Sequence, residues 1–496
     1  MNTIRQKIGL LILVAFVAIF TLSCGSKKES SQPAEYHSIN DLKGHKVAIM
    51  QGSSYEFALK DSVDIELQYY STHSEIILAI TSGKADCGIL DNVVVMNADL
   101  QSMGVEATEI DGFDTDVAVA FSKENSELRR NFNAFLNEIK SNGKFDEIYN
   151  RWCLGNIDDA VMPKIDIPTN GKTIVAAMLD DQVPFAFIKN NEMSGFEVEL
   201  IKTWANHENY SLVIERMPFP SMIAALQSGK ADVALACMSI TEERKKSIDF
   251  SDPYYLCRGC CITKANDTNQ STSVVQWIKN GFQKNVLEED RWKMILDGLW
   301  ETLVITFGAL IFGTLLAMGI CYLRMRKNKV ACGFAKFYIT FMRGIPILVL
   351  LMILFYVVFA DAGLTSRWIA IIAFSMNFAA YAGEIFRGGI EGVDNGQWEA
   401  GWAMGFSKLK TFAYFIMPQS LKQIIPVYKG EVISLLKGTS IVGYIAIQDL
   451  TKVSDIIRGR TFDAFFPLLI ITVIYFLLAW LLGLAIEKLS GVNKIH

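Results

Sequence analysis

The stretch GQWEAGWAMGFSKLKTFAYFIMP, residues 396–418, lies between segments that are apolar enough to cross a bilayer. It contains a glutamate, lysines and apolar residues at spacings that a helix accepts. Charged groups are costly in the hydrocarbon of a membrane. The stretch is therefore expected to form a short helical insertion in water, at one end of a group of membrane helices.

The composition indicates a chain with two different halves. Its 496 residues exceed the ~100–200 residues of a typical domain. Apolar residues make up 51%, charged residues 20%, and the formal net charge is −5, which gives no sign of nucleic-acid binding. Residues 30–295 have the turn signals of a soluble chain, whereas residues 300–490 are dominated by long apolar runs.

Residues 1–24 have the order of an export signal: basic residues, the uncharged run IGLLILVAFVAIFTL, and small residues around Cys24. A cysteine at this point, followed by a flexible linker at residues 25–37, resembles a bacterial lipoprotein signal with Cys24 as the lipid attachment site. Thr21 stands where such signals usually have leucine, so an uncleaved anchor is the alternative. In both cases the segment that follows is expected outside the cytoplasm.

The other cysteines give no metal pattern. Cys257, Cys260 and Cys261 are close together, but no histidine or second cysteine pair accompanies them at zinc spacing. They are expected to be small apolar residues of a strand, with a disulfide as the alternative, and no metal is predicted.

Five segments of the second half are expected to cross the membrane as helices, because ~20 apolar residues span its hydrocarbon. The fifth of them contains Lys437, which should face the interior of the bundle. The segments are Thr302–Leu323, Gly344–Ala360, Trp368–Gly383, Ala464–Ile486 and, least apolar, Val432–Gln448.

Basic residues indicate the orientation of these spans. If the soluble half is exported, the first span delivers the basic segment RMRKNK, residues 324–329, to the cytoplasm. The loop at about 388–430 is then cytoplasmic as well, and it carries further lysines. Arg458 and Arg460 fall outside and count against this orientation. The balance places residues 396–418 in the cytoplasm.

Residues 396–418 resemble the cytoplasmic EAA loop of importer-type ABC permeases. The matching residues are Glu399, Ala400, Gly405 and Pro418. Gly401 and Phe415 depart from the family pattern. The flanking FMRGIPILVLLMILF and KGEVISLLKGTSIVGYI resemble the polar amino acid branch, so the resemblance covers a permease domain at residues 298–490.

The resemblance implies that this loop is a coupling helix that docks into a groove of a separate ATPase, through Glu399, Ala400 and Gly405. Small residues permit close approach to such a partner. The chain itself has no phosphate loop, because NGKT at 170–173 lacks the first glycine and the preceding strand. ATP and Mg²⁺ are therefore expected on the partner ATPase, with no cofactor and no enzyme activity in this chain.

The soluble half resembles the periplasmic amino acid-binding proteins, which are α/β clamshells of two lobes. Residues 172–265 resemble the first lobe and residues 38–155 the second, joined by a linker at 156–171 and followed by a connector at 266–297. The lobes stand in reverse order, which predicts a circularly permuted clamshell followed by an all-α permease of five helices. Only one hinge strand, at about Asp116–Phe121, is expected to stay continuous.

The resemblance also implies a site for an α-amino acid. Arg244 would grip the carboxylate through a planar fork, and Asp91, on the other lobe, would bind the ammonium. Ser239 and Ser54 would supply backbone N–H groups and Phe219 an aromatic face. Two further predicted contacts are a carbonyl of Cys237 and the carboxylate of Asp180. Asp180 aligns with the family aspartate only after a one-residue shift, and Gln182 replaces the usual stacking aromatic.

Two other classes of protein remain as alternatives. Amino acid-gated ion channels also join clamshells to membrane helices, and TSIVGYI at 439–445 is close to a potassium filter. A membrane sensor is the second alternative. The favoured interpretation is an importer subunit of the bacterial inner membrane, with the binding half on the outer side. Two copies would pair around one pathway, driven by the ATPase, and the sequence does not name the amino acid.

Overall fold

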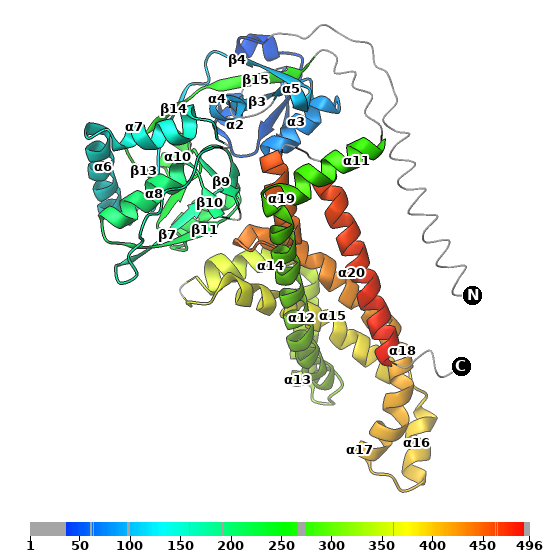
Figure 1. Cartoon of the computed structure of the whole chain (residues 1–496). Coiled ribbons are helices and arrows are strands. Elements are labelled where there is room, and N and C mark those ends of the chain that lie inside the picture. Colours follow the sequence, from blue (N-terminus) through cyan, green and yellow to red (C-terminus); the bar gives the residue numbers. More distant parts are fainter. Residues whose placement is uncertain are drawn as a thin grey trace.

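The computed structural model describes residues 36–490, apart from residues 60, 61, 63, 97–99, 158, 191, 266–273, 361, 462 and 464. An α/β part with two lobes sits at one end of a group of long helices (Figure 1). The predicted signal at residues 1–24, including Cys24, and most of the predicted linker at residues 25–37 lie outside the described residues.

Lobe 2 is built on a five-stranded sheet with the strand order β2-β1-β3-β15-β4. Strand β1 pairs in parallel with β2 and β3, whereas β15 runs antiparallel to both of its neighbours. Gly88 in β3 allows helix α3 to approach the sheet, because a Cβ there would lie 2.6 Å from Ile76 Cγ2. The elements of this lobe are η2 (Ile39–Leu42), β1 (Lys46–Met50), α2 (Ser54–Leu59), β2 (Glu66–Tyr70), α3 (His73–Thr81), β3 (Cys87–Asp91), α4 (Asn92–Met96), α5 (Leu100–Met103), β4 (Val105–Glu109) and β15 (Gly259–Lys264).

Lobe 1 has a second five-stranded sheet, with the order β11-β7-β12-β6-β13, and a small sheet with the order β10-β9-β8. Helix α6 packs against α8 through Phe132 and Trp204, whose ring centroids are 5.3 Å apart. The elements are β6 (Ala120–Phe121), α6 (Ser126–Ser141), α7 (Lys144–Tyr149), η3 (Asn150–Leu154), β7 (Thr173–Met178), β8 (Asp181–Gln182), β9 (Ala186–Lys189), β10 (Glu192–Ser194), α8 (Phe196–His207), β11 (Ser211–Arg216), α9 (Phe219–Gln227), β12 (Val233–Leu235), α10 (Glu242–Lys245) and β13 (Asp249–Phe250).

Each of the two soluble segments contributes to both lobes. The segment at residues 38–155 leaves lobe 2 through β5 (Thr115–Val117) and supplies β6, α6 and α7 to lobe 1. The segment at residues 172–265 leaves lobe 1 through β14 (Tyr255–Cys257) and supplies β15 to lobe 2. Because β5 and β14 pair antiparallel, two continuous strands join the lobes. The expectation of a single continuous hinge strand is therefore wrong, whereas the circular permutation stays a prediction.

The membrane half consists of helices, three of which are long and apolar enough to cross a membrane: Ile278–Arg324, Ser366–Glu391 and Phe466–Lys488. Two bent pairs raise the number to five among the described residues if each pair counts as one span. The elements are α11 (Val274–Phe282), η4 (Gln283–Leu287), η5 (Glu288–Asp290), α12 (Arg291–Arg324), α13 (Lys329–Gly344), α14 (Ile347–Ile353), η6 (Leu354–Val358), α15 (Ser366–Glu391), α16 (Asn395–Ala403), α17 (Lys408–Thr411), η7 (Phe412–Ile416), α18 (Met417–Gly438), η8 (Thr439–Ile445), α19 (Leu450–Thr461) and α20 (Phe466–Ser490).

The bent pairs differ from the predicted spans. The predicted segment Gly344–Ala360 starts at a 103° bend, and helix α13 before it was not predicted. The bend has a local cause: Ile345 is extended because it precedes Pro346, and the residue before a proline is disfavoured in the helical region. In α18, Lys437 is exposed instead of facing the bundle interior, so that expectation is wrong.

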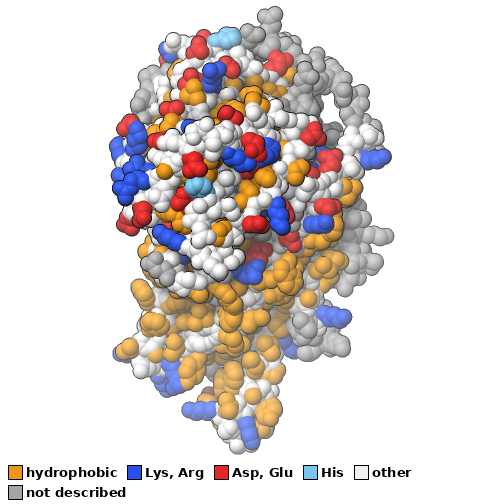
Figure 2. Space-filling view, turned by 60° about the vertical axis from the view of Figure 1, so that its left-hand side comes forward, with side chains coloured by type: hydrophobic (Ala, Val, Ile, Leu, Met, Phe, Trp, Pro, Cys, Tyr) orange, Lys and Arg blue, Asp and Glu red, His pale blue; other side chains and the backbone are white. Residues whose placement is uncertain are grey.

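Glycines bring the two central helices, α12 and α15, close together. A Cβ at Gly308 would lie 2.9 Å from Ile371 Cδ1, and a Cβ at Gly313 would lie 3.1 Å from Ser375 O. Small residues of this kind permit close packing of membrane helices. The outer surface of this half is strongly apolar, with orange side chains below the mixed surface of the lobes (Figure 2).

Candidate functional site

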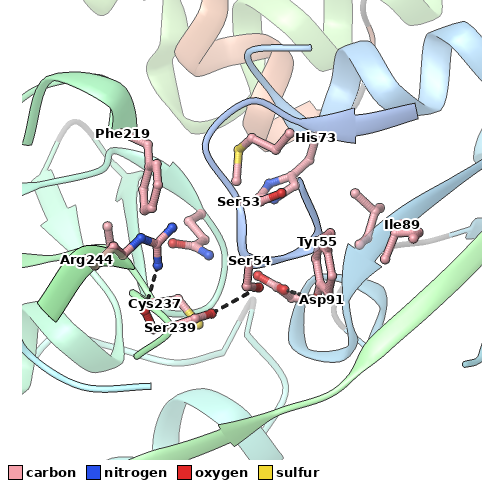
Figure 3. A pocket seen from close by; sticks show the side chains of 14 residues that line it. Ser53, Ser54, Tyr55, His73, Ile89, Asp91, Phe219, Cys237, Ser239 and Arg244 are labelled. Atoms are coloured by element: carbon pink, nitrogen blue, oxygen red, sulfur yellow. Dashed lines mark hydrogen bonds between the residues drawn. The ribbon is translucent and has the colours of Figure 1, made fainter. Parts of the chain in front are cut away.

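A pocket lies between the two lobes and encloses about 390 Å³, including its part open to solvent. It opens where β1, β3 and α2 of lobe 2 face α9 and α10 of lobe 1 (Figure 3). Its lining residues are Met50, Ser53, Ser54, Tyr55, His73, Ile89, Leu90, Asp91, Gln182, Phe219, Ala236, Cys237, Ser239 and Arg244. Six of the seven predicted contact residues are therefore in one pocket, and Asp180 is not among them.

The cation of the pocket is Arg244, which α10 holds at 4% exposure. Its Nη1 donates to Ser239 O at 2.7 Å, and its Nη2 donates across the cleft to Gly52 O at 2.7 Å. Its guanidinium carbon lies 5.0 Å from the centre of the Phe219 ring. Burial lowers the pKa of Arg244 to about 10, which leaves it charged, and the charge of Asp91 opposes that shift. The plane and the position of the Arg244 guanidinium are thus fixed before a carboxylate binds to it.

The anion of the pocket is Asp91, the last residue of β3. Tyr55 donates its hydroxyl to Asp91 Oδ1, and burial together with the charge of Asp91 raises the pKa of Tyr55. The Asp91 carboxylate and the sulfur atoms of Cys237 and Cys257 lie within 4.8 Å of one another, so these three groups could also hold a metal ion. The spacing of the cysteines in the sequence did not reveal this set, because it is assembled from β3, β14 and the bend after β12.

Serine hydroxyls connect the two lobes at the pocket. Ser239 Oγ lies 3.3 Å from Ser54 Oγ and 3.0 Å from Thr115 Oγ1. Beside them, Cys237 adopts a φ of +45°, which is uncommon for a non-glycine residue. Its N–H donates to the buried Glu197 at 2.7 Å, and burial raises the pKa of Glu197 to about 7. Glu197 therefore positions the backbone at Cys237, and the carbonyl contact predicted for this residue is not tested.

The eight cysteines among the described residues are free thiols. Cys257 lies in β14, whereas Cys260 and Cys261 lie in β15, and all three are buried. The interpretation of these residues as small apolar strand residues is confirmed, and the disulfide alternative is not supported in this part of the chain.

Asp180 lies at the membrane side of the pocket and contacts the other half of the chain. It is 1% exposed, its Oδ1 lies 3.1 Å from Lys452 Nζ, and its Oδ2 accepts from Gln448 Nε2 at 3.1 Å. Gln182, two residues further along, lines the pocket, whereas the carboxylate of Asp180 bonds with the membrane half.

Helix α19 of the membrane half contacts both lobes. Besides the contacts of Lys452 with lobe 1, Arg458 lies 3.4 Å from Glu75 of lobe 2. Gly459 allows close contact with lobe 1, because a Cβ there would lie 2.7 Å from Asp181 Cβ. Arg458 also pairs with Asp455 at 2.9 Å. Helix α19 therefore lies across the membrane-facing side of the cleft.

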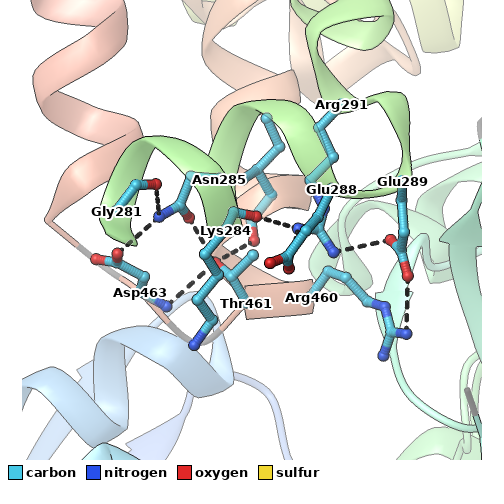
Figure 4. Close-up of polar contacts among 10 residues, drawn as sticks. Gly281, Lys284, Asn285, Glu288, Glu289, Arg291, Arg460, Thr461 and Asp463 are labelled. Carbon is cyan, nitrogen blue, oxygen red and sulfur yellow. Dashed lines mark hydrogen bonds and ion pairs between the residues drawn. The ribbon is translucent and has the colours of Figure 1, made fainter. Parts of the chain in front are cut away.

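A buried polar cluster fixes the far end of α19 to the connector (Figure 4). Thr461 donates to Asn285 Oδ1 at 2.9 Å, and Asn285 donates to Asp463 at 2.8 Å. Glu289 lies 3.0 Å from Arg460 and 2.8 Å from Arg291. Such hydrogen-bonded networks rigidify the elements they join. Helix α19 is thus anchored in the membrane half before it meets the lobes.

Replacing Lys452 with methionine is expected to destabilise the contact between the halves by about 3 kcal/mol, because a buried Asp180 would lose its cation. Thermal unfolding of the full chain in detergent, followed with limited proteolysis of the binding half, measures this. Lys245→Met is the control, because Lys245 forms an ion pair that is largely exposed. The double variant with Asp180→Asn should recover much of the loss. Additive effects of the two changes would contradict the assigned pairing.

Several pocket residues were not predicted from the sequence: Ser53, Tyr55, His73 and the supporting Glu197. Gln182, which stands where the family has a stacking aromatic, does line the pocket. Tyr55 and Ser53 adjoin the predicted Ser54, so a wider window around QGSSYEF was the available signal. Glu197 is in the first turn of α8 and gives no local signal of its contact with Cys237, which is 40 residues away.

The predicted coupling segment forms α16 and α17 at the end of the molecule opposite the lobes (Figure 1). Helix α16 ends in a turn in which Gly405 has a φ of +81°, its N–H donates to Trp402 O and Phe406 N–H donates to Gly401 O. This is a Schellman motif, which favours glycine at the left-handed position. A Cβ at Gly401 would lie 2.4 Å from Thr411 Cγ2, so glycine is required there for α16 to pack on α17.

The segment at residues 396–418 exposes several large apolar side chains. Glu399 and Ala400 are exposed, and so are Trp402 at 46%, Leu409 at 78% and Tyr414 at 67%. Exposed apolar groups rimmed by charged residues are typical of interaction sites. The segment therefore has the composition expected for a docking surface in water.

Two family models match the chain. Residues 23–155 and 174–331, more than half of the chain, match the bacterial extracellular solute-binding proteins of family 3. Residues 309–490 match the inner membrane component of binding-protein-dependent transport systems.

Known proteins match the chain as well. The probable amino-acid ABC transporter permease protein YckA of Bacillus subtilis is 36% identical over 185 residues, which are 36% of this chain and 80% of that protein. The L-cystine transport system permease protein TcyB of the same organism is 34% identical over 202 residues, 40% of this chain and 86% of that protein. A crystal structure of an amino acid ABC transporter with histidines covers 45% of this chain and 99% of that chain, at 30% identity and a TM-score of 0.38.

The family models and the sequence relatives confirm the resemblance in both halves, and the two-lobed α/β part followed by a helical membrane part confirms the general fold class, whereas the permutation and the number of five spans stay predictions. The chain therefore belongs to the bacterial extracellular solute-binding proteins of family 3, and the permease domain of an amino-acid ABC importer is fused to its binding domain in the same polypeptide.

Proposed function

We propose that the chain captures a polar amino acid outside the bacterial inner membrane and passes it to a pathway formed by its own membrane half. The observation that carries this proposal is the position of Arg244 and Asp91 in one pocket, on opposite lobes. An α-amino acid has one carboxylate and one ammonium, which match this cation and this anion. A zwitterion that bridges the lobes stabilises their closed arrangement.

A separate ATPase would dock on the surface formed by α16 and α17 and use ATP and Mg²⁺. The support is the match of the membrane half to importer permeases, together with the place of the exposed segment at the end opposite the lobes (Figure 1). Capture of the solute and docking of the ATPase would then take place on opposite sides of the membrane. We further propose that two copies of the chain pair their membrane halves around one pathway.

The ion channel alternative has less support. The filter-like segment TSIVGYI folds as the short 3₁₀ helix η8, in which Thr439, Val442 and Ile445 are buried. A potassium filter instead presents a ring of carbonyl oxygens to the ion. The described residues therefore favour a permease over a channel.

A ligand panel tests the proposal. The full chain in detergent is titrated with each of the twenty amino acids. The midpoint of thermal unfolding is measured as a function of the amino acid concentration. Stabilisation by at least one polar amino acid is expected. Co-purification with an ATPase whose activity rises with that amino acid would distinguish an importer from a sensor. If none of the twenty shifts the unfolding midpoint, amino acid capture is wrong.

A further inference from the structure

Few charged side chains line the pocket. Among the described residues that line it, Arg244 and Asp91 carry the permanent charges, and His73 is the other titratable group with a basic nitrogen. The carboxylate and ammonium of an amino acid would use Arg244 and Asp91. The side chain of the solute then meets apolar Met50 and Ile89, and the polar atoms of other lining residues.

Two of those polar atoms are buried without a hydrogen-bond partner among the described residues. Gln182 is 1% exposed and its Oε1 has no partner, and Ser53 is 7% exposed and its Oγ has none. Gln182 belongs to β8 of lobe 1, whereas Ser53 precedes α2 of lobe 2. Buried polar atoms are normally hydrogen-bonded, and each exception costs free energy. A solute group placed between the lobes can satisfy both atoms.

We infer that Gln182 and Ser53 form a side-chain subsite that selects an amino acid with a carboxamide, glutamine or asparagine; this rests on the proposed function. A carboxamide offers N–H donors and a carbonyl acceptor. It can therefore donate to Gln182 Oε1 and accept from the Ser53 hydroxyl. A glutamine amide is itself a donor and an acceptor, so the match to a second amide holds for either orientation of the Gln182 side chain.

Charged side chains fit this subsite less well. A cationic side chain needs a second carboxylate, but the nearby Asp180 already pairs with Lys452 and Gln448 of the membrane half. A carboxylate side chain would need a second cation, but Arg244 is already used by the α-carboxylate of the amino acid. Burying a charge without an opposite charge is more costly than burying a hydrogen-bonded neutral group. An apolar side chain leaves both orphaned atoms unpaired.

The test is a set of titrations with the full chain in detergent, with a chelator present to remove any metal from Asp91, Cys237 and Cys257. Glutamine, asparagine, glutamate, lysine and norleucine are the ligands, because they compare a carboxamide with an anion, a cation and an apolar chain. We expect the better carboxamide to bind at least ~30-fold more tightly than the other three, since a polar site rejects analogues that leave its groups unpaired.

Variants of Gln182 and Ser53 test whether these two residues cause the preference for a carboxamide. Gln182→Leu is expected to reduce the ratio of glutamine to norleucine affinity to about one, and Ser53→Ala to reduce it severalfold. Gln182→Glu should shift the preference towards lysine, because it adds a carboxylate. Gln227→Leu, on the exposed end of α9 in the same lobe, is the matched control and should leave the ratio unchanged.

The outcomes separate this inference from the proposed function. If norleucine, lysine or glutamate binds the wild-type protein as tightly as glutamine and asparagine, the inference is wrong and amino acid capture stands. An unchanged ratio in both Gln182→Leu and Ser53→Ala would also overturn it. If no amino acid binds the folded protein, the inference and the proposed function fail together.

Discussion

Replacing Arg244 with alanine is expected to weaken binding of the amino acid by at least ~3 kcal/mol, a factor of ~150, because the solute carboxylate would be buried without its cation. Arg244 is 4% exposed, and its two bonds to Ser239 O and Gly52 O fix the fork on both lobes. The substitution therefore removes the charge and the link across the cleft together. Calorimetric titration of the full chain in detergent measures the change.

Three companion variants test the planar fork, the neighbouring cation and the opposite charge of the pocket. Arg244→Lys keeps a cation but cannot make planar, bidentate contacts, so an intermediate loss is expected. Lys245→Ala changes the next residue, whose side chain is about half exposed and pairs with Glu242, and it should leave affinity unchanged. Asp91→Asn should weaken binding as well, because Tyr55 can still donate to the amide but the ammonium loses its counter-charge. Affinities of Arg244→Ala and Asp91→Asn within threefold of wild type would refute the assigned site.

The general architecture was predictable because its signals are local. Long apolar runs predicted the membrane half, and the segment at residues 396–418 forms α16 and α17 as expected. Arg244, Asp91 and their neighbours were found through motifs whose residues are close in the sequence. Six of the seven predicted contact residues line one pocket, and their role as ligand contacts stays a prediction.

The exchange of elements between lobes was harder to predict. The strands that carry the chain across, β5, β6 and β14, have only two or three residues. Hydrophobic periodicity can be recognised only over longer stretches of sequence. Strands this short therefore do not reveal to which sheet they belong. The long linker at 156–171 was visible in the sequence, but the second continuous crossing at β14 and β15 was not.

Asp180 shows why contacts between the halves were not predictable. Its partner Lys452 is separated from it by the whole permease core, and a sequence without the fold does not pair them. Other contacts of helix α19 involve the two arginines that counted against the predicted orientation. Arg458 pairs with Glu75 and Asp455, and Arg460 pairs with Glu289. Because these arginines form ion pairs within the protein, they count less as evidence in the positive-inside rule, which is based on the charges of loops.

Replacing Gly405 with tryptophan is expected to abolish uptake while amino acid affinity stays within about twofold of wild type, because distant sites are energetically independent. No heavy atom lies within 4 Å of a Cβ at Gly405, so the added side chain would project from the end of α16 into the space that a docked ATPase would fill. Vesicles reconstituted with the co-purified ATPase measure uptake and amino acid-stimulated ATP hydrolysis.

Strain is the competing explanation for such a loss, because Gly405 has a φ of +81°, where L-residues are disfavoured. The chain offers a matched control in lobe 2. Gly83 follows α3 in the same Schellman arrangement, with a φ of +71° and no atom within 4 Å of its Cβ. Gly83→Trp therefore carries a similar backbone cost at a place where no ATPase is proposed to dock, and it should retain uptake.

A second variant changes the packing of the helices beneath the same surface. Gly401→Ala places a Cβ 2.4 Å from Thr411 Cγ2, which should push α16 away from α17 without adding a protruding group. If docking needs the two helices in their observed arrangement, this single methyl group reduces stimulated ATP hydrolysis and uptake together, again with unchanged affinity. Gly405→Trp blocks the outer surface and Gly401→Ala shifts its support, so a shared defect with unchanged affinity is the result expected if this surface docks the ATPase. Normal uptake in both variants would show that the ATPase docks elsewhere.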